Sequence, residues 1–372
     1  MELNTEARTE TAPLGGPPSV EIARPDDWHV HLRDDEMLAA VAPITAATFR
    51  YALVMPNLVP PIATAAAAAD YRQRILSVVG RPPDGREPFV PIMTAYLSPE
   101  LDVDDLRRGA EAGIWRAVKY YPAGATTNSE HGGSSLPACG AVLDALCEMG
   151  LPLLVHAEST DPTIDIFDRE RAFLDAELAP VTDAWPELAV TVEHVSTRAG
   201  VEFVTDHPQV RGSITPHHLR CDRSDLVANG LRPDLYCKPI INSADDRAAL
   251  VAAATSGSPD WFLGTDSAPH PTAHKYTDRA KPGIFNAPFA LPVVAEVFHR
   301  AGALSHLEAF VSLNGCAHYG YPPSGEKLRL TRVAEDCGST GEPIPDSVVT
   351  ADGQQVIIFG VDEARCWRVE WL

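Results

Sequence analysis

Short runs of apolar and β-branched residues recur along the 372-residue chain and alternate with longer stretches of helical patterning. Short apolar runs of this kind are typical of buried strands, and the stretches between them favour helices. Strands and helices that alternate in this way pair in parallel through right-handed crossovers. The runs that we predict as strands lie at residues 19–24, with a continuation toward His29, and at 51–57, 89–97, 116–122, 152–158, 189–196, 210–218 and 260–267.

Eight predicted strands favour an α/β fold, a closed (β/α)8 barrel of the TIM type, over an open doubly wound sheet. After residue 321 the pattern changes to β-rich runs and turns, which predict a small extension packed on the outside of the barrel. Residues 1–18 are rich in Thr, Glu, Gly and Pro and predict a disordered tail. We therefore expect a tail at 1–18, a barrel at 19–321 and a C-terminal β-rich extension at 322–372.

Composition narrows the possible partners. The formal net charge of −21 argues against sequence-independent nucleic-acid binding, which needs clustered Lys and Arg, but it allows an anionic small-molecule substrate. No apolar run approaches the roughly 20 residues that span a bilayer, so no membrane partner is expected. The seven cysteines are widely spaced and lack a C-x-x-C pair, which predicts reduced thiols and a cytoplasmic location.

The segment DWHVHLRD concentrates polar residues on one face. If it is extended, its side chains alternate with a period of two, so His29, His31 and Arg33 point the same way. Two imidazoles and a guanidinium are a poor composition for a core. The octapeptide by itself leaves two interpretations open, a ligand cluster or the polar face of a surface strand.

Other ionisable residues lie within, at the ends of, or just after further predicted strands, at Lys119, His156, His194, Asp266 and His270. In a barrel the loops that follow the strands build the active site, so these side chains are expected to converge on one pocket. Each of them alone has an ordinary explanation, such as a hydrogen-bonded structural His or a helix-capping Asp. Their joint placement favours a functional pocket.

The chemistry of this set indicates a metal site. Neutral imidazoles and carboxylates are usual ligands of zinc, and a metal with an open position lowers the pKa of bound water. Lys119 is the exception, because its ammonium would repel a metal ion. Carbon dioxide can convert such an amine to a carbamate, whose two anionic oxygens can bridge two cations.

Seven segments, taken in order, resemble the successive motifs of the dihydroorotase family: RPDDWHVHLRD, LVMPNLVPP, AVKYYPAGATTNSEHG, LLVHAE, VEHVST, SITPHHL and FLGTDSAPH. The resemblance is to the single-function type, within the amidohydrolase superfamily of metal-dependent barrels, and it covers most of the chain. It implies the reversible interconversion of N-carbamoyl-L-aspartate and dihydroorotate in de novo pyrimidine biosynthesis.

The resemblance also implies a cofactor, two zinc ions per chain bridged by a carboxylated lysine. In this family pattern a hydroxide between the metals attacks the ring amide. Asp266 acts as general base and then as general acid. The implied metal ligands are His29, His31, Lys119, His156, His194 and Asp266.

The resemblance assigns a substrate-binding role to further positions. Arg33, Asn57 and His270 match positions that hold the substrate carboxylate, which agrees with the planar donor geometry of Arg and the neutral donor of Asn. Thr126 and Thr127 belong to the segment PAGATTNSEHG, which matches a mobile loop that reaches the bound substrate.

Two residues depart from the family pattern. Lys238 stands where bacterial relatives often carry Leu, and Pro282 stands where a small residue often lies. Both positions contact the substrate through the backbone in the family, and a proline offers a carbonyl but no N–H. For His217 and His218 we favour a structural role.

Two other classes of function compete with this interpretation. A dihydropyrimidinase or hydantoinase shares the metals but gives no reason for a carboxylate grip by Arg33, Asn57 and His270. A metal-free barrel scaffold would have lost ligands, whereas all six expected positions carry a suitable residue. Neither G-x-S-x-G nor a P-loop motif occurs. The resemblance further suggests a homodimer.

Overall fold

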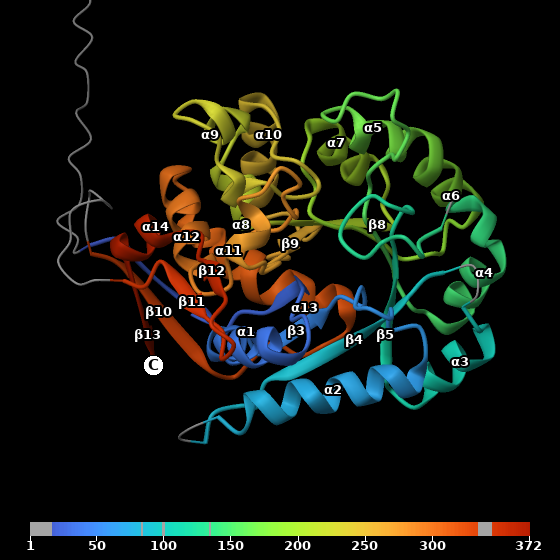
Figure 1. Cartoon of the computed structure of the whole chain (residues 1–372), viewed down its shortest axis with the longest axis horizontal. Coiled ribbons are helices and arrows are strands. Elements are labelled where there is room, and N and C mark those ends of the chain that lie inside the picture. The colour runs from blue at the N-terminus through green and yellow to red at the C-terminus, as the bar shows by residue number, and fades with distance from the viewer. Residues whose placement is uncertain (1–16, 83–84, 99–100, 134, 334–343) are drawn as a thin grey trace, which may run out of the picture.

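Eight parallel strands pair in chain order at the centre of the molecule (Figure 1). The structure is a computed structural model, and it describes residues 17–82, 85–98, 101–133, 135–333 and 344–372. A parallel bridge between Val30 and Ser267 joins the two ends of the sheet, which closes it into the predicted (β/α)8 barrel. The barrel strands are β2 (Asp27–Val30), β3 (Tyr51–Val54), β4 (Val90–Tyr96), β5 (Trp115–Tyr120), β6 (Leu153–Val155), β7 (Val190–Val192), β8 (Val210–Ile214) and β9 (Trp261–Leu263).

Helices surround these strands (Figure 1). A capping box begins one of them, because the side chains of Ser243 and Asp246 each accept a hydrogen bond from the other residue's backbone N–H. The α-helices are α1 (Asp35–Thr48), α2 (Ala65–Val79), α3 (Val103–Glu111), α4 (Gly140–Met149), α5 (Arg169–Phe173), α6 (Ala179–Ala184), α7 (Arg198–Asp206), α8 (Pro216–Arg220), α9 (Arg223–Val227), α10 (Ala244–Thr255), α11 (Thr272–Lys275), α12 (Ala290–Arg300), α13 (Asn314–Tyr319) and α14 (Val361–Cys366). Shorter helical turns lie at Pro137–Cys139, Leu174–Leu178, Pro233–Leu235, Leu304–His306 and Ala309–Leu313.

The alternation of side chains along the strands separates two apolar layers. On β5, Val118 belongs to the large layer between strands and helices, whereas Ala117 packs with Leu154 and Phe262 inside the barrel. Lys119 is two residues beyond Ala117, so it also points into the barrel, closer to the carboxyl end of the strand. The strand period thus buries a lysine in the barrel interior.

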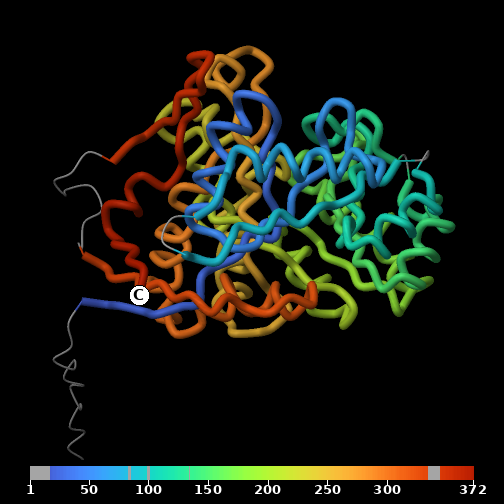
Figure 2. Tube along the Cα trace, turned by 90° about the horizontal axis from the view of Figure 1, so that it is seen from below, coloured from blue at the N-terminus to red at the C-terminus, as the bar shows by residue number. Residues whose placement is uncertain are grey.

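The first predicted strand does not belong to the barrel. β1 (Ser19–Ala23) pairs antiparallel with β10 (Lys327–Arg332), which pairs with β13 (Trp367–Trp371), and Figure 2 shows the blue β1 beside the orange-red C-terminal strands. The prediction that residues 19–24 form the first barrel strand was therefore wrong. Ser19 and Glu21 are exposed, and a strand with one solvent-exposed face is typical of an open antiparallel sheet. Every residue of the barrel strand β2, in contrast, is buried.

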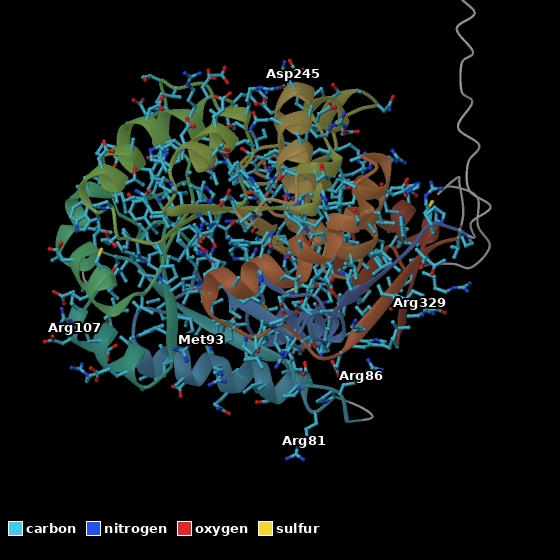
Figure 3. All side chains as sticks on the ribbon, turned by 180° about the vertical axis from the view of Figure 1, so that it is seen from behind. Arg81, Arg86, Met93, Arg107, Asp245 and Arg329 are labelled. Atoms are coloured by element: carbon cyan, nitrogen blue, oxygen red, sulfur yellow. The ribbon has the colours of Figure 1, made fainter. Side chains whose placement is uncertain are left out.

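The C-terminal strands confirm the predicted β-rich extension. A second antiparallel pair, β11 (Ser347–Val349) with β12 (Gln355–Ile357), completes it. Charged side chains such as Arg107, Asp245 and Arg329 point outward around the molecule (Figure 3). The division of the chain after residues 18 and 321 stays a prediction, and residues 1–16 of the expected tail lie outside the described residues.

The cysteines differ from the expectation at one position. Cys366 is disulfide-bonded, so the prediction of reduced thiols was wrong for this residue. The other described cysteines, Cys139, Cys147, Cys221, Cys237 and Cys316, carry free thiols. Among the described helices, none combines the length and apolar character that a membrane crossing requires.

Glu296 of α12 fastens the extension to the barrel. Its carboxylate accepts hydrogen bonds from Arg332 Nε at 3.0 Å, Trp367 Nε1 at 2.9 Å and Arg300 Nε at 2.8 Å. Burial would raise the pKa of Glu296, but these hydrogen bonds outweigh burial and lower it to about 2. Folding therefore favours the ionised form of Glu296 over its protonated form more than the unfolded chain does.

Glu296→Gln is expected to lower the free energy of unfolding by about 2–4 kcal/mol at pH 7, since it removes a buried charged acceptor. A depressed pKa stabilises the fold above the unfolded value of about 4.3, and this contribution is lost as the pH falls further. Urea unfolding of wild type and variant should show a difference that narrows between about pH 5 and the folded pKa of about 2. A difference that does not change with pH would contradict this account.

Candidate active site

A small cavity lies at the carboxyl ends of the barrel strands. Eleven of the thirteen residues predicted for the site line this cavity: His29, His31, Arg33, Asn57, Thr126, Thr127, His156, His194, Lys238, Asp266 and Pro282. The remaining two lie next to it. Lys119 is fully buried beneath Tyr121, and His270 contacts Arg33. The structure therefore brings the predicted set together, while the roles of its members stay proposals.

Three ligand atoms meet on one side of the cavity. His29 Nε2 and His31 Nε2 lie 3.3 Å apart, and Asp266 Oδ1 lies 3.3 Å from the first and 3.1 Å from the second. His31 Nδ1 lies 2.8 Å from Asn57 Oδ1, and this contact leaves His31 Nε2 directed toward Asp266. Two imidazoles and a carboxylate at this spacing form a candidate metal site.

A second pair of imidazoles lies on the other side. His156 Nδ1 is 3.1 Å from His194 Nε2, and His156 Nε2 is 3.1 Å from Glu158 Oε2. His194 Nδ1 is buried without a hydrogen-bond partner. The Glu158 contact fixes the orientation of the His156 ring, as a carboxylate typically does for a metal-binding imidazole.

Backbone strain marks two of these residues. His194 has φ 43° and Asp266 has φ 45°, both in the left-handed region that residues with a Cβ rarely adopt. On β7, Val190 and Val192 belong to the outer layer, so simple alternation would place His194 outside the barrel as well. The left-handed turn redirects its ring into the cavity. Strain of this kind clusters at functional sites.

Glu193 is a site residue that our sequence reasoning missed. Its side chain is fully buried, pairs with Lys119, and places Oε1 2.9 Å from His29 Nδ1. Alternation along β7 identifies it, because Glu193 is two residues after the inward Thr191. Tyr121 was also missed, although it lies two residues after Lys119. Its hydroxyl is buried without a hydrogen-bond partner, and the residue lines the cavity.

Electrostatics keep most of the imidazoles neutral. Burial lowers the pKa of His31 to about 4, and burial with the charges of His156 and Lys119 holds the pKa of His194 well below its usual value. Burial also lowers the pKa of Lys119, although Glu193 opposes this effect. Neutral imidazoles offer the lone pairs that metal ligation requires.

Asp266, in contrast, is held in its charged form. Burial would raise its pKa, but hydrogen bonds from His29 and His31 outweigh burial and hold the pKa well below its usual range. Burial would likewise lower the pKa of His29, but Glu193 and Asp266 raise it to about 9. The cluster therefore combines an ionised carboxylate with its imidazole neighbours, and this donor set suits a divalent cation.

Arg33 forms the cationic side of the cavity. Its Nη2 lies 3.0 Å from His270 Nε2, and its Nε donates to the Pro269 carbonyl at 3.2 Å. Burial and the Arg33 charge lower the pKa of His270 to about 2, so the His270 ring is neutral. Asn57 Nδ2 donates to the Thr127 carbonyl at 2.9 Å, which ties the predicted loop to the cavity.

Lys238 enters the site through its side chain. Its ammonium pairs with Glu158, the same carboxylate that contacts His156. The family resemblance assigned this position only a backbone contact. The structure thus adds a contact that the resemblance does not imply. The Lys238 side chain is linked through Glu158 to His156, a candidate metal ligand.

A third group of possible ligands lies outside the cavity. His217, His218 and Cys237 are buried close together. The ring nitrogens of His218 contact Thr215 Oγ1 at 2.9 Å and the Pro239 carbonyl at 3.2 Å, so they are engaged in structural hydrogen bonds. This arrangement agrees with the structural role expected for His218.

Comparison with known proteins decides the family. No family model matches the chain. However, a dihydroorotase from Ruegeria pomeroyi is 50% identical over 353 residues, which is 94% of this chain and 99% of that protein. Another, from Parasynechococcus marenigrum, is 46% identical over 350 residues, 94% of this chain and 97% of that protein. The chain belongs to the dihydroorotase family.

Solved structures agree with this assignment. Dihydroorotase from Saccharomyces cerevisiae, in complex with 5-fluoroorotic acid, superposes with a TM-score of 0.83 at 29% identity, over 95% of this chain and 98% of that one. Dihydroorotase from Campylobacter jejuni gives 0.82 at 31%, over 96% and 99%. L-hydantoinase from Arthrobacter aurescens shares the fold alone, at 0.70 and 18% over 91% and 88%.

These comparisons confirm the predicted activity of this dihydroorotase, the interconversion of N-carbamoyl-L-aspartate and dihydroorotate in pyrimidine biosynthesis. The family is metal-dependent, and the described residues contain His, Asp and Glu groups that suit a metal ion. A small-molecule substrate is consistent with both findings.

Proposed function

We propose that this dihydroorotase opens and closes the dihydroorotate ring in the cavity at the carboxyl ends of its barrel strands. The observation that carries the proposal is the position of Arg33, backed by His270, beside the cluster of His29, His31 and Asp266. A guanidinium suits the substrate carboxylate, and the cluster suits metal-assisted attack on an amide. One cavity therefore holds both parts that the reaction requires.

The proposed cofactor is a pair of zinc ions. The first ion would bind to the imidazoles of His29 and His31 and the carboxylate of Asp266. The second would bind to His156 Nδ1 and His194 Nε2, and a carboxylated Lys119 would bridge the two. Two bound zinc ions supply a hydroxide near neutral pH and polarise the amide carbonyl. Support comes from the neutral, buried imidazoles of His31 and His194 and from a Lys119 whose pKa burial lowers.

Asp266 is the proposed general base and general acid. Its carboxylate would take the proton released during attack on the ring amide and deliver it to the leaving nitrogen. In the direction of ring closure the same carboxylate would move the proton back. Two imidazole contacts and a hydrogen bond from Asp266 N to the His29 carbonyl at 2.9 Å fix its position.

Arg33, Asn57 and His270 are the proposed carboxylate-binding residues. Thr126 and Thr127 would reach the substrate from the loop above them. The Thr127 hydroxyl supports this role, since it is buried at the cavity without a hydrogen-bond partner. A substrate carboxylate or ring amide would satisfy it. Lys238 and Pro282 would complete the wall of the cavity.

We further propose that the enzyme is a cytoplasmic homodimer. The family resemblance supports the dimer. Five of the six described cysteines carry free thiols, which supports a reducing compartment, whereas Cys366 is disulfide-bonded. Sedimentation of the purified protein measures the first part of this proposal, and a monomer at micromolar concentration would contradict it.

Arg33→Met is expected to raise the KM for dihydroorotate by about 10- to 100-fold, because it removes charge-assisted hydrogen bonds worth about 1.5–3 kcal/mol. Zinc content should stay unchanged, since Arg33 is not a proposed ligand. Dihydrouracil, which has the same ring without the carboxylate, should be a poor substrate of the wild type. Steady-state kinetics and metal analysis of both proteins measure these effects.

Arg74→Met is the matched control for this experiment. Arg74 is partly exposed and pairs with Asp34 at 2.7 Å on the surface, so its loss should leave KM unchanged. Loss of zinc in Arg33→Met would contradict the proposal that Arg33 binds the substrate carboxylate and not the metal. Equal turnover of dihydrouracil and dihydroorotate by the wild type would favour a different cyclic amidohydrolase.

A further inference from the structure

Lys275, at the end of α11, is a buried lysine outside the proposed set of catalytic, metal-binding and substrate-binding residues. It is 5% exposed, and no carboxylate among the described residues forms an ion pair with it. Its ammonium instead donates to three backbone carbonyls, Tyr236 at 2.7 Å, Gly283 at 2.7 Å and Lys281 at 3.1 Å. All three N–H donors of the ammonium are therefore used on the main chain.

A buried charge without a counter-ion is costly unless its hydrogen bonds are complete. Burial lowers the pKa of Lys275 to about 8, so the amine is still mostly charged at neutral pH. A neutral Met or Leu would fill the same space without this desolvation. The three carbonyl contacts give a reason for a lysine here, because only a tetrahedral ammonium joins three backbone oxygens at one point.

The carbonyls belong to two segments that form one wall of the active site. Tyr236 is two residues before Lys238, while Lys281 and Gly283 lie on either side of Pro282. Lys238 and Pro282 both line the cavity. The Gly283 N–H also donates to the Tyr236 carbonyl at 2.9 Å, so the two segments meet directly beside the ammonium.

The backbone at Gly283 lies very close to its neighbours. It has φ 145°, and a Cβ at this position would lie 2.5 Å from the Ala268 carbonyl and 3.0 Å from the His270 ring. The segment therefore passes close to the strand end that carries Asp266 and to the ring that contacts Arg33. A small shift of the segment would change the shape of the substrate cavity.

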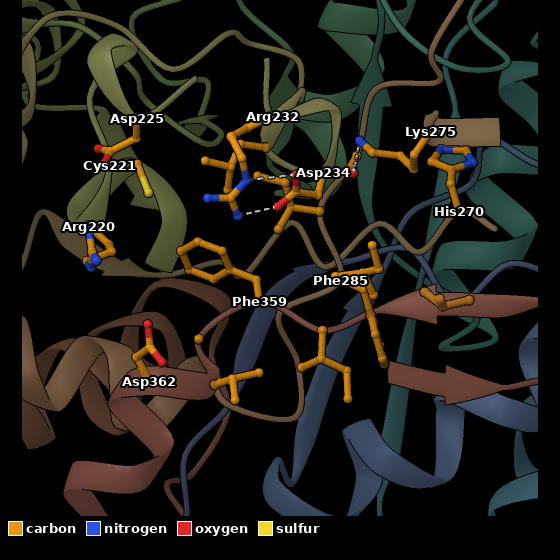
Figure 4. Close-up of a pocket in the computed structure, with 18 of the residues that line it drawn as sticks. Arg220, Cys221, Asp225, Arg232, Asp234, His270, Lys275, Phe285, Phe359 and Asp362 are labelled. Carbon is orange, nitrogen blue, oxygen red and sulfur yellow. Dashed lines mark hydrogen bonds and ion pairs between the residues drawn. The ribbon is translucent and has the colours of Figure 1, made fainter. Parts of the chain in front are cut away.

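A second cavity borders this wall. A cavity of about 260 Å³ lies on its other side, lined by Lys275, His270, Gly283, Phe285 and residues of the C-terminal extension such as Phe359. Figure 4 shows Lys275 and His270 together at one end of this cavity. Ile284 packs in an apolar cluster with Leu235 and Cys237, and the hydrogen bonds of Lys275 additionally fix the carbonyls on either side of Pro282.

We propose that Lys275 is a positioning residue for substrate binding, which holds the backbone at Lys238 and Pro282 in the geometry that the substrate requires. The inference rests on the proposed function, since it assumes that these two segments contact the substrate. It assigns no chemistry to Lys275 itself. The residue acts through the carbonyls of Tyr236, Lys281 and Gly283.

Kinetics of Lys275→Met test this proposal. The variant keeps the length and apolar stem of lysine but lacks the donors. Its KM for dihydroorotate should rise at least about tenfold, while kcat per folded, zinc-loaded chain changes by less than about threefold. The control is Lys327→Met, which removes an exposed lysine of β10 and should leave KM unchanged.

The outcomes separate positioning from a general structural role. If Lys275→Met folds with reduced thermal stability but wild-type KM, the residue is structural and the proposal is overturned. If it does not fold, Lys275→Gln, which keeps two N–H donors, is expected to fold with an intermediate KM. A wild-type KM in Lys275→Gln, or failure of both variants to fold, also overturns the proposal. Inactivity of the wild type would instead contradict the proposed function.

Discussion

Asp266→Asn is expected to lower kcat by at least about a thousandfold in both directions of the reaction. Asn has nearly the same shape as Asp but cannot accept the proton that the reaction moves. It also removes the negative charge that lies between the imidazoles of His29 and His31. Steady-state rates of ring opening and ring closure, normalised to folded protein, measure the effect.

An aspartate just before the amino end of β9 provides the control. Asp260 lies at the opposite end of β9, where its carboxylate pairs with Arg211 at 3.3 Å on the surface. Asp260→Asn should keep wild-type kcat. Zinc content should be measured for both proteins, because Asp266 is also a proposed ligand. An Asp266→Asn variant with zinc bound and more than a tenth of wild-type turnover would exclude Asp266 as the proton carrier.

Lys119→Arg is expected to lower kcat by at least about a thousandfold and to lower zinc content, although it keeps a positive charge in the barrel. The reason is chemical, because a guanidinium does not form the carbamate that would bridge two metal ions. The structure offers a competing explanation, the ion pair between Lys119 and Glu193. If this pair is the function of Lys119, an arginine should preserve much of the activity.

Two further measurements separate these explanations. Lys119→Met removes both the charge and the amine, so it should be inactive under either explanation and sets the baseline for Lys119→Arg. Incubation of the wild type with 13C-labelled bicarbonate should give a protein carbamate signal by NMR that both variants lack. High activity of Lys119→Arg, or a wild type without any carbamate signal, would contradict the bridging role.

The strand pattern predicted the barrel because buried parallel strands are short, apolar and regularly spaced. Seven of the eight predicted runs overlap strands of the barrel sheet, β3 to β9. The prediction for residues 19–24 was wrong because an apolar run indicates a strand but not the sheet that the strand joins. Its pairing with Lys327–Arg332, more than 300 residues away, depends on tertiary packing that no local pattern contains.

The candidate site could be predicted from the polar residues at the strand ends. The carboxyl ends of the strands in a barrel lie together, so residues there converge even when they are far apart in the sequence. Lys119 could be placed by alternation alone. His194 could not, because its left-handed backbone breaks the alternation on β7. Glu193 was missed although alternation was sufficient to find it. The pairing of Lys238 with Glu158 and the ties of Lys275 join segments far apart in the sequence, so only the fold brings them together.

The central claim is that two metal ions in this cavity carry out the reaction. The most direct test measures bound zinc and turnover of dihydroorotate in the same purified preparation, before and after removal of the metal with a chelator. We expect about two zinc ions per chain, activity that disappears with the metal, and recovery when zinc is restored. Full activity in a metal-free preparation would contradict the account.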